Sequence, residues 1–87
     1  MKKEEIKEYH DNGELAYEET KVILPKSREY LYPYRLKHPD GYCWIRIGKQ
    51  AKYHDNGILA WELQRDENGK VIDGKNGYRK DGTPIIY

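Results

Sequence analysis

Residues 9–18 read YHDNGELAYE, and residues 53–62 repeat them as YHDNGILAWE, 44 positions further along the chain. Eight of the ten positions are identical, and one of the two differences replaces one aromatic residue with another. A third, weaker copy at residues 78–82 keeps the tyrosine and an Asp-Gly pair. Self-similarity at a fixed spacing is typical of repeated supersecondary units, so the chain is built on a repeat.

The centre of each copy is an Asn-Gly pair, which is a strong hairpin signal because both residues tolerate positive φ. We therefore predict an all-β fold, either a single antiparallel meander sheet or a small open barrel built from β-hairpin repeats. It should have about six to eight short strands and no helix longer than two turns. The turn signals are Asn12-Gly13, Asp40-Gly41, Asn56-Gly57, Asn68-Gly69, Asn76-Gly77 and Asp81-Gly82, with Asp73-Gly74 as a further candidate.

The segments between the turns carry strand patterns of different kinds. Alternation over residues 30–36 predicts a strand with Tyr30, Tyr32 and Tyr34 on one face, and residues 42–47 form an aromatic and β-branched strand. Residues 59–65 are also expected to be a strand. Residues 21–24 favour an edge strand that runs into a Pro25 linker, and residues 1–8 a frayed helical turn.

The repeat also predicts which side chains anchor the sheet. Period-two spacing places the paired positions 15 and 17, and 59 and 61, on one face, so we expect Leu15, Tyr17, Leu59 and Trp61 to be buried. Gly13 and Gly57 should have positive φ. The substitution Trp61→Ala should cost about 3 kcal/mol or more, and a largely exposed Trp61 would instead belong to a binding surface.

Length and composition favour one domain spanning residues 1–87. The repeat copies lie near residues 6–20 and 50–64, the weak copy spans 76–87, and a divergent basic aromatic centre spans 21–49. Hydrophobic residues make up 37% of the chain and aromatic residues 13%, which indicates a thin core built largely from rings. No apolar run approaches the length of a membrane span, and no secretory signal follows Met1. The single cysteine, Cys43, favours a cytoplasmic location.

The net charge of +1 conceals an uneven distribution. Residues 1–20 carry a balance of −4, residues 21–52 one of +6, and residues 53–87 one of −1. An acidic arm beside a basic centre can pair within one molecule or between two. A thin sheet with an uncovered face also favours a homodimer.

The repeat resembles the variant MORN repeat, in which successive β-hairpins carry a Tyr before an Asn-Gly turn and a Leu beyond it. The first copy matches at Tyr9, Asn12, Gly13, Leu15 and Glu18, the second at Tyr53, Asn56, Gly57, Leu59 and Glu62, and the third at Tyr78, Asp81 and Gly82. The match covers about a third of the chain, and the 44-residue spacing is about twice the family's usual repeat. The resemblance implies a non-enzymatic scaffold that binds proteins or lipid headgroups, in bacteria often antitoxin-like.

The candidates for chemistry are few. His10-Asp11 and His54-Asp55 offer nitrogen and oxygen ligands for a divalent metal, but a histidine that caps a turn beside a backbone-bonding aspartate accounts for both copies. Ser27 has no histidine near it in sequence, and Cys43 suits a buried strand position. We therefore expect no enzyme activity, no catalytic residues, no metal and no cofactor.

The basic aromatic centre supplies the candidate binding residues. These are Tyr30, Tyr32, Tyr34, Arg35, Tyr42, Trp44 and Arg46. Tyr, Trp and Arg are enriched at binding hot spots, so the prediction is a module that occupies the surface of a larger protein partner, as an antitoxin or a mobile-element inhibitor does. The alternative is a β domain that binds single-stranded nucleic acid with the same rings and bases. A third reading makes the rings the core of the sheet.

Overall fold

The computed structural model describes residues 1–85, and residues 86 and 87 of the weak third copy lie outside the described part. Strands make up 54% of these described residues and helix 7%, which confirms the all-β prediction. The elements are β1 (Lys2–Tyr9), β2 (Leu15–Leu24), the 3-10 helix η1 (Lys26–Leu31), β3 (Leu36–Lys37), β4 (Cys43–Tyr53), β5 (Leu59–Arg65) and β6 (Val71–Asn76).

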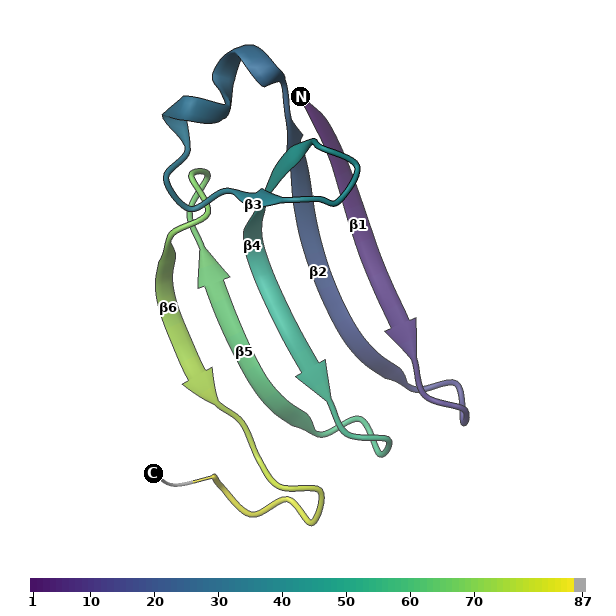
Figure 1. Ribbon diagram of the computed structural model, residues 1–87. Coiled ribbons are helices and arrows are strands. Elements are labelled where there is room, and N and C mark those ends of the chain that lie inside the picture. The colour runs from purple at the N-terminus through teal and green to yellow at the C-terminus, as the bar shows by residue number, and fades with distance from the viewer. Residues whose placement is uncertain (86–87) are drawn as a thin grey trace.

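The six strands form one antiparallel sheet in the order β1-β2-β4-β5-β6, and β3 pairs with the beginning of β4 (Figure 1). The sheet is not closed, so of the two architectures predicted, the structure is the meander sheet and not the barrel. Three turns lie along one edge of the sheet, at the bottom of Figure 1: the turn between β1 and β2, the turn between β4 and β5, and the turn that follows β6.

Five turns share one geometry, in which the glycine N–H donates to the carbonyl three residues earlier. In the first copy, Gly13 N donates to His10 O at 2.9 Å, and His10 N donates to Glu14 O at 2.8 Å. Gly13 and Gly57 have φ of 89° and 85°, as predicted, but among residues 1–85 only glycines have positive φ. The loop is therefore a tight turn closed by a left-handed glycine, and not one with two left-handed residues.

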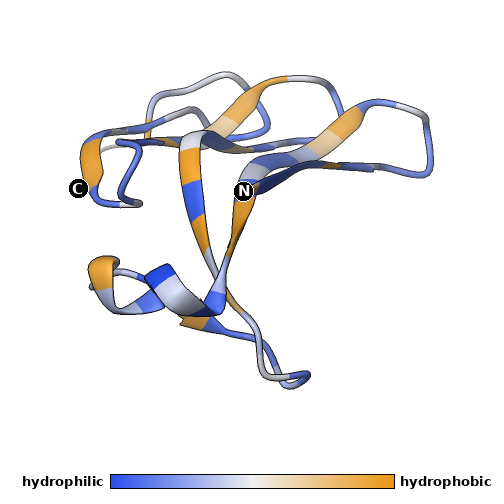
Figure 2. Cartoon of the chain, turned by 90° about the horizontal axis from the view of Figure 1, so that it is seen from above, coloured by the Kyte–Doolittle hydropathy of each residue, from blue (hydrophilic) through white to orange (hydrophobic). Residues whose placement is uncertain are grey.

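A sharp irregularity in β4 separates the two halves of the sheet. Gly48 has a φ of 64°, and the pairing of β2 with β4 shifts register between Glu18 and Thr20. Bulges of this kind bend a strand and increase its twist. Beyond the bend lies the end unit, defined as residues 25–42, which projects from one face of the sheet (Figure 2).

The buried core lies where the end unit meets β2 and β4. Val22 and Leu24 on β2 pair with Ile45 and Cys43 on β4, and all four are buried. Tyr32 packs against this cluster from the end unit. This hydrophobic cluster is therefore supplied by the segment between the repeat copies, while Ala51, in the second copy, is buried outside the cluster.

The prediction of a strand over residues 30–36 is wrong, because residues 26–31 form η1. Pro25 begins the helix with φ −66°, and Arg28 N donates to its carbonyl. Tyr32 ends the helix in an extended conformation, since Pro33 disfavours helical dihedrals at the residue before it. Only Tyr30 belongs to η1, so the three rings do not share the face of a strand: Tyr30 lines one concavity, Tyr32 packs on the core and Tyr34 lines another concavity.

The expectations for residues 1–8 and for residues 21–24 are also corrected. Residues 1–8 belong to β1 and not to a helical turn, because the first hairpin turn sets Glu4 opposite Lys21 and Lys7 opposite Glu18. Residues 21–24 are not an edge strand, because β2 lies between β1 and β4. The polar composition of β1 is that of an edge strand.

Two of the glycine pairs do not make turns. Asp73-Gly74 lies inside β6, and Asn76-Gly77 lies at its end. Both glycines are sites of close approach: a Cβ on Gly77 would overlap the carbonyl of Leu59, and one on Gly74 would lie 2.9 Å from the Leu63 side chain. Glycine here allows packing rather than a turn.

The four anchor residues are half-buried and not buried, which corrects the expectation for the repeats. Tyr17 and Trp61 meet edge to face, with ring centroids 6.3 Å apart. Lys52 lies between them in the register, opposite Tyr17 on one side and Trp61 on the other. A single-layer sheet has no second layer to cover these rings, so they remain partly open to solvent.

Candidate partner-binding site

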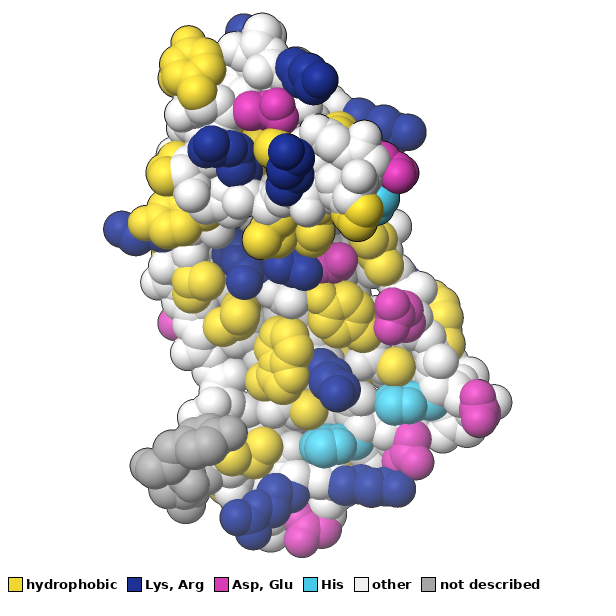
Figure 3. Space-filling view, in the orientation of Figure 1, with side chains coloured by type: hydrophobic (Ala, Val, Ile, Leu, Met, Phe, Trp, Pro, Cys, Tyr) yellow, Lys and Arg dark blue, Asp and Glu magenta, His cyan; other side chains and the backbone are white. Residues whose placement is uncertain are grey.

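A groove of about 480 Å³ lies where the end unit faces the strands β4 to β6. We call it the basic groove; its lining residues are Tyr34, Arg35, Leu36, Arg46, Arg65, Gly69, Lys70 and Val71. Four of them are basic and none is acidic. Figure 3 shows basic and hydrophobic side chains side by side across the middle of this face, below the end unit. The groove therefore combines positive charge with exposed apolar surface.

Two guanidinium groups in the groove share one network of hydrogen bonds. Arg46 Nε donates to Glu19 Oε2 at 2.6 Å, and the same oxygen accepts from the Tyr17 hydroxyl at 2.8 Å. Gln50 Nε2 donates to the Tyr17 hydroxyl, and Arg65 donates to Gln50 Oε1. Arg46 thus has a carboxylate partner, while Arg65 binds a neutral amide.

The electrostatics of Arg65 reflect this arrangement. Burial and the neighbouring charge of Arg46 lower the pKa of the Arg65 guanidinium from its ordinary value. The burial of Tyr17 itself, together with its hydrogen bond to Glu19, raises the pKa of the Tyr17 phenol. A partly buried cation next to another cation gains from a further anion. The basic groove is consequently suited to a carboxylate or phosphate supplied from outside.

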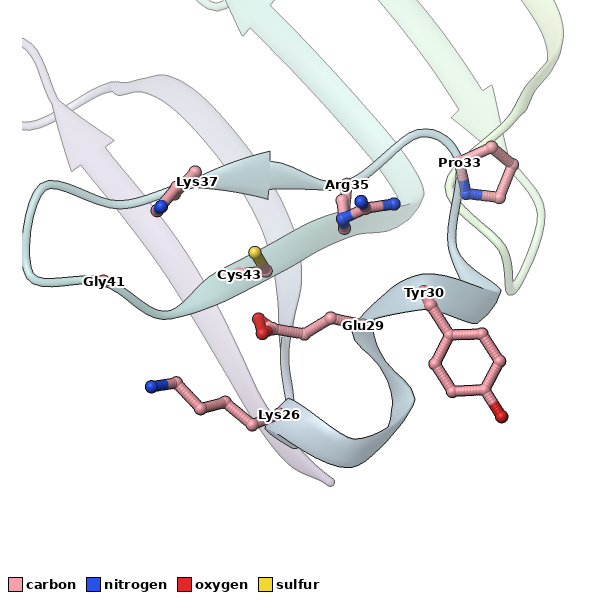
Figure 4. Close-up of a pocket in the computed structure, with 8 residues that line it drawn as sticks. All are labelled: Lys26, Glu29, Tyr30, Pro33, Arg35, Lys37, Gly41 and Cys43. Atoms are coloured by element: carbon pink, nitrogen blue, oxygen red, sulfur yellow. The ribbon is translucent and has the colours of Figure 1, made fainter.

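A second concavity, the outer hollow, lies on the other side of Arg35 and has a volume of about 840 Å³ (Figure 4). In Figure 4 the Glu29 carboxylate points toward the Cys43 sulfur, with Lys26 and Lys37 to either side. Glu29 Oε2 is buried and has no hydrogen-bond partner among the described residues. The neighbouring Glu29 carboxylate and burial raise the pKa of the Cys43 thiol, which disfavours the reactive thiolate form.

The seven predicted binding residues do not form one surface. Tyr34, Arg35 and Arg46 line the basic groove. Tyr30, 75% exposed, lines the outer hollow together with Arg35.

The remaining three rings already have partners within the chain. Tyr42 stacks on His38, with centroids 4.3 Å apart. The Trp44 ring has the Lys21 ammonium 5.2 Å and the Arg46 guanidinium 4.7 Å from its centroid. Tyr32 packs on the core, so of the five rings only Tyr30 and Tyr34 are mostly exposed.

Half of the residues that line the basic groove lie outside the basic aromatic centre from which the binding residues were predicted. Arg65 and Lys70 flank the turn between β5 and β6, and Val71 begins β6, outside the basic aromatic centre. Their contribution depends on the end unit folding back over the sheet. No local pattern in the sequence marks that long-range contact.

The repeat histidines belong to a ladder of bonds between adjacent turns. His10 Nε2 bonds to the carbonyl of Tyr53 at 2.8 Å, and Asn12 Nδ2 donates to the carbonyl of Asp55 at 2.6 Å. The second copy repeats both bonds to the third, from His54 to Tyr78 at 2.7 Å and from Asn56 to Lys80 at 2.6 Å. We call these four bonds the turn ladder; Figure 3 shows histidines in a row near that edge.

The aspartates of the repeat act differently from the expectation. The side chains that bond their own turn are Asn12, which accepts from Glu14 N at 3.0 Å, and Asn56, which accepts from Ile58 N at 3.2 Å. Asp55 instead pairs with Lys80 of the next turn, with Nζ 3.0 Å from Oδ1. Turn geometry thus explains the repeated Asn, and contact between turns explains the repeated His.

Comparison with known proteins adds no relative: no protein-family model, curated protein or solved structure matches this chain. Within residues 1–85, no helix is long and apolar enough to cross a membrane.

Proposed function

We propose that this chain is a non-enzymatic protein-binding module that holds an acidic and apolar segment of a larger partner in the basic groove. The observation that carries the proposal is the lining of that groove: four basic side chains beside Tyr34, Leu36 and Val71, with no carboxylate among them. Tyr34 is 52% exposed, and Leu36 and Val71 are also exposed. A cationic site with an apolar wall is suited to alternating acidic and hydrophobic side chains.

The most specific contact should form at Arg65. The Arg65 guanidinium is hydrogen-bonded to a neutral group, the Gln50 amide. The neighbouring Arg46 already binds the Glu19 carboxylate, so a carboxylate from a partner is free to bind Arg65. A partner's Asp or Glu at this point gains a charge-assisted hydrogen bond in a partly desolvated site. Leu36 and Val71 then receive the neighbouring apolar residue.

A protein partner is favoured over single-stranded nucleic acid by the state of the rings. Binding of bases requires free ring faces in series. Tyr42 and Trp44 are engaged by His38, Lys21 and Arg46, which leaves few open platforms. The resemblance to MORN-type scaffolds supports the same choice, and the role that we propose is antitoxin-like or that of a mobile-element inhibitor, which occupies a partner surface in the cytoplasm.

The test compares affinity capture from the native host's lysate by three forms of the full chain. Arg35→Glu/Arg65→Glu reverses two charges of the basic groove, and Arg28→Glu, on η1 and outside the groove lining, is the matched control. We expect a protein retained by the wild type and the control, lost by the double variant and unaffected by nuclease treatment.

A salt titration against a generic single-stranded oligonucleotide separates the alternative. Binding to nucleic acid weakens steeply as salt rises, because counterions are released from the phosphates. Tight, salt-sensitive binding that Arg35→Glu/Arg65→Glu abolishes, with no groove-dependent protein in the lysate, would establish the nucleic-acid function instead.

A further inference from the structure

The turn ladder has a direction. In each of its two steps, a histidine and an asparagine side chain of one turn reach carbonyls of the next turn, always toward the C-terminus. The accepting carbonyls occupy equivalent positions: Tyr53 and Asp55 in the second turn, and Tyr78 and Lys80 in the third. The distances of the two steps agree within 0.1 Å. Each turn is thus a donor on one side and an acceptor on the other.

The first turn carries the same two acceptors, and they face the open edge of the sheet. Repeat equivalence assigns them to the carbonyls of Tyr9 and Asp11, in the positions of Tyr53 and Asp55. Within residues 1–85, β1 has a strand neighbour on one side only, and no side chain donates to either carbonyl. An edge strand with unpaired backbone groups is a template for another strand.

The third turn does not present the matching donors. Arg79 stands where the other turns have histidine, and Asp81 where they have asparagine. The Asp81 carboxylate accepts from Thr83 N at 2.9 Å and has no N–H to donate onward. Pro84, which follows, lacks a backbone N–H for a further strand. This end of the ladder is therefore capped, which prevents one copy from adding head to tail onto the open edge of another.

We propose that the β1 edge, with the carbonyls of Tyr9 and Asp11, is a docking site for a β-hairpin of another protein whose turn reads His-x-Asn-Gly. The incoming histidine and asparagine make the two bonds that His10 and Asn12 make to the second turn, while the outgoing strand pairs with β1. This surface is distinct from the basic groove, so either can be correct without the other.

The ladder also fixes the register and favours one residue at position x. A strand displaced along β1 loses both turn bonds at once, so only one register gains them. Residues at the second position of adjacent turns lie side by side, as the Asp55–Lys80 ion pair demonstrates. Position x of the incoming turn therefore lies beside Asp11, which favours Lys or Arg there.

The test gives the third turn the histidine and asparagine of the first two turns. Arg79→His/Asp81→Asn/Pro84→Thr converts the capped turn to His-Lys-Asn-Gly. Its histidine and asparagine are the residues that the first two turns have at the positions equivalent to 79 and 81. We expect this triple variant to form head-to-tail oligomers that grow with concentration in sedimentation velocity. The wild type, which has an open β1 edge and a capped end, should shorten these oligomers when added.

The matched control is Arg79→His/Pro84→Thr, which keeps the Asp81 carboxylate. It lacks the donating amide, so its association should be about tenfold weaker than that of the triple variant. If the triple variant is poorly folded by circular dichroism, Arg79→His/Asp81→Asn with Pro84 retained takes its place. Absence of assembly by a folded variant, equal assembly by the control, or failure of the wild type to shorten the oligomers would each overturn the proposal.

Discussion

The two ends of the sheet are stabilised by different interactions. At the turn edge, polar side chains of one repeat bond to carbonyls of the next, and the aromatic residues nearby stay half-exposed. At the other end, Val22, Leu24 and Ile45 are buried under the end unit. The repeated sequence thus encodes a polar ladder that sets the order and register of hairpins. The unrepeated centre supplies the hydrophobic cluster and one half of the basic groove, and Arg65, Lys70 and Val71 complete the groove from β5, β6 and the turn between them.

The largest expected effect tests whether the core lies at the end-unit side. Ile45 is 1% exposed, so Ile45→Ala should lower the free energy of unfolding by about 3 kcal/mol, through lost burial and a residual cavity. Ile72 on β6 is 64% exposed, and Ile72→Ala should change it by less than about 0.5 kcal/mol. Urea unfolding measures both, and equal losses would mean that the core is elsewhere.

A second prediction separates glycines that permit packing from those that permit a turn. Gly77→Ala places a methyl group against the carbonyl of Leu59 and should cost about 2 kcal/mol or more. Gly13→Ala meets open space but forces alanine to a φ of 89°, which should cost about 1 kcal/mol. If the order of the two losses in thermal unfolding is reversed, the close approach at β5 and β6 is not as described.

The third prediction tests the ladder directly. Asn12→Asp and Asn56→Asp keep the oxygen that accepts from their own turn but remove the amide that donates to the next turn. Each should cost about 1 kcal/mol. Asn68 lies in a turn of the same geometry outside the ladder, and Asn68→Asp should be nearly neutral. Equal effects at all three positions, measured by urea unfolding, would contradict an energetic role for the ladder.

The sequence predicted the repeats and their turns better than the unrepeated centre. The repeat predicted hairpins, the left-handed glycines at 13 and 57 and the strand at residues 59–65, because these depend on local turn chemistry. It did not predict η1, whose boundaries depend on Pro25 and Pro33 rather than on the alternating tyrosines. The half-burial of Trp61 was missed because alternation shows which face a residue lies on, but not whether another layer covers that face.

The candidate site was predicted only in part, for a similar reason. Tyr34, Arg35 and Arg46 line the basic groove as members of the basic aromatic centre. Arg65 and Lys70 join them because the end unit lies over the strands β4 to β6. The bend of β4 at Gly48 allows this arrangement. Contacts between segments this far apart in sequence leave no short-range pattern to read.

The smallest expected effect concerns the acid sensitivity of the turn edge. The hydrogen bond and charge of Lys80 lower the pKa of the Asp55 carboxyl from its ordinary value of 3.8. A carboxyl with a lowered folded-state pKa stabilises the fold above its ordinary pKa, and this contribution is lost as pH falls through the lowered value. Lys80→Ala should therefore raise the pKa of Asp55 in an NMR titration and reduce stability at neutral pH more than at the acid end.

The matched variant for this last test is Lys75→Ala, on β6. Burial alone would raise the pKa of Glu62, but the hydrogen bond and charge of Lys75, together with Lys49, lower it. Lys75→Ala should raise the pKa of Glu62 and leave that of Asp55 unchanged, while Lys80→Ala should do the reverse. If both variants shift both carboxyls, the charges act through the field of the whole sheet and not through separate pairs at the turn edge and on the strands.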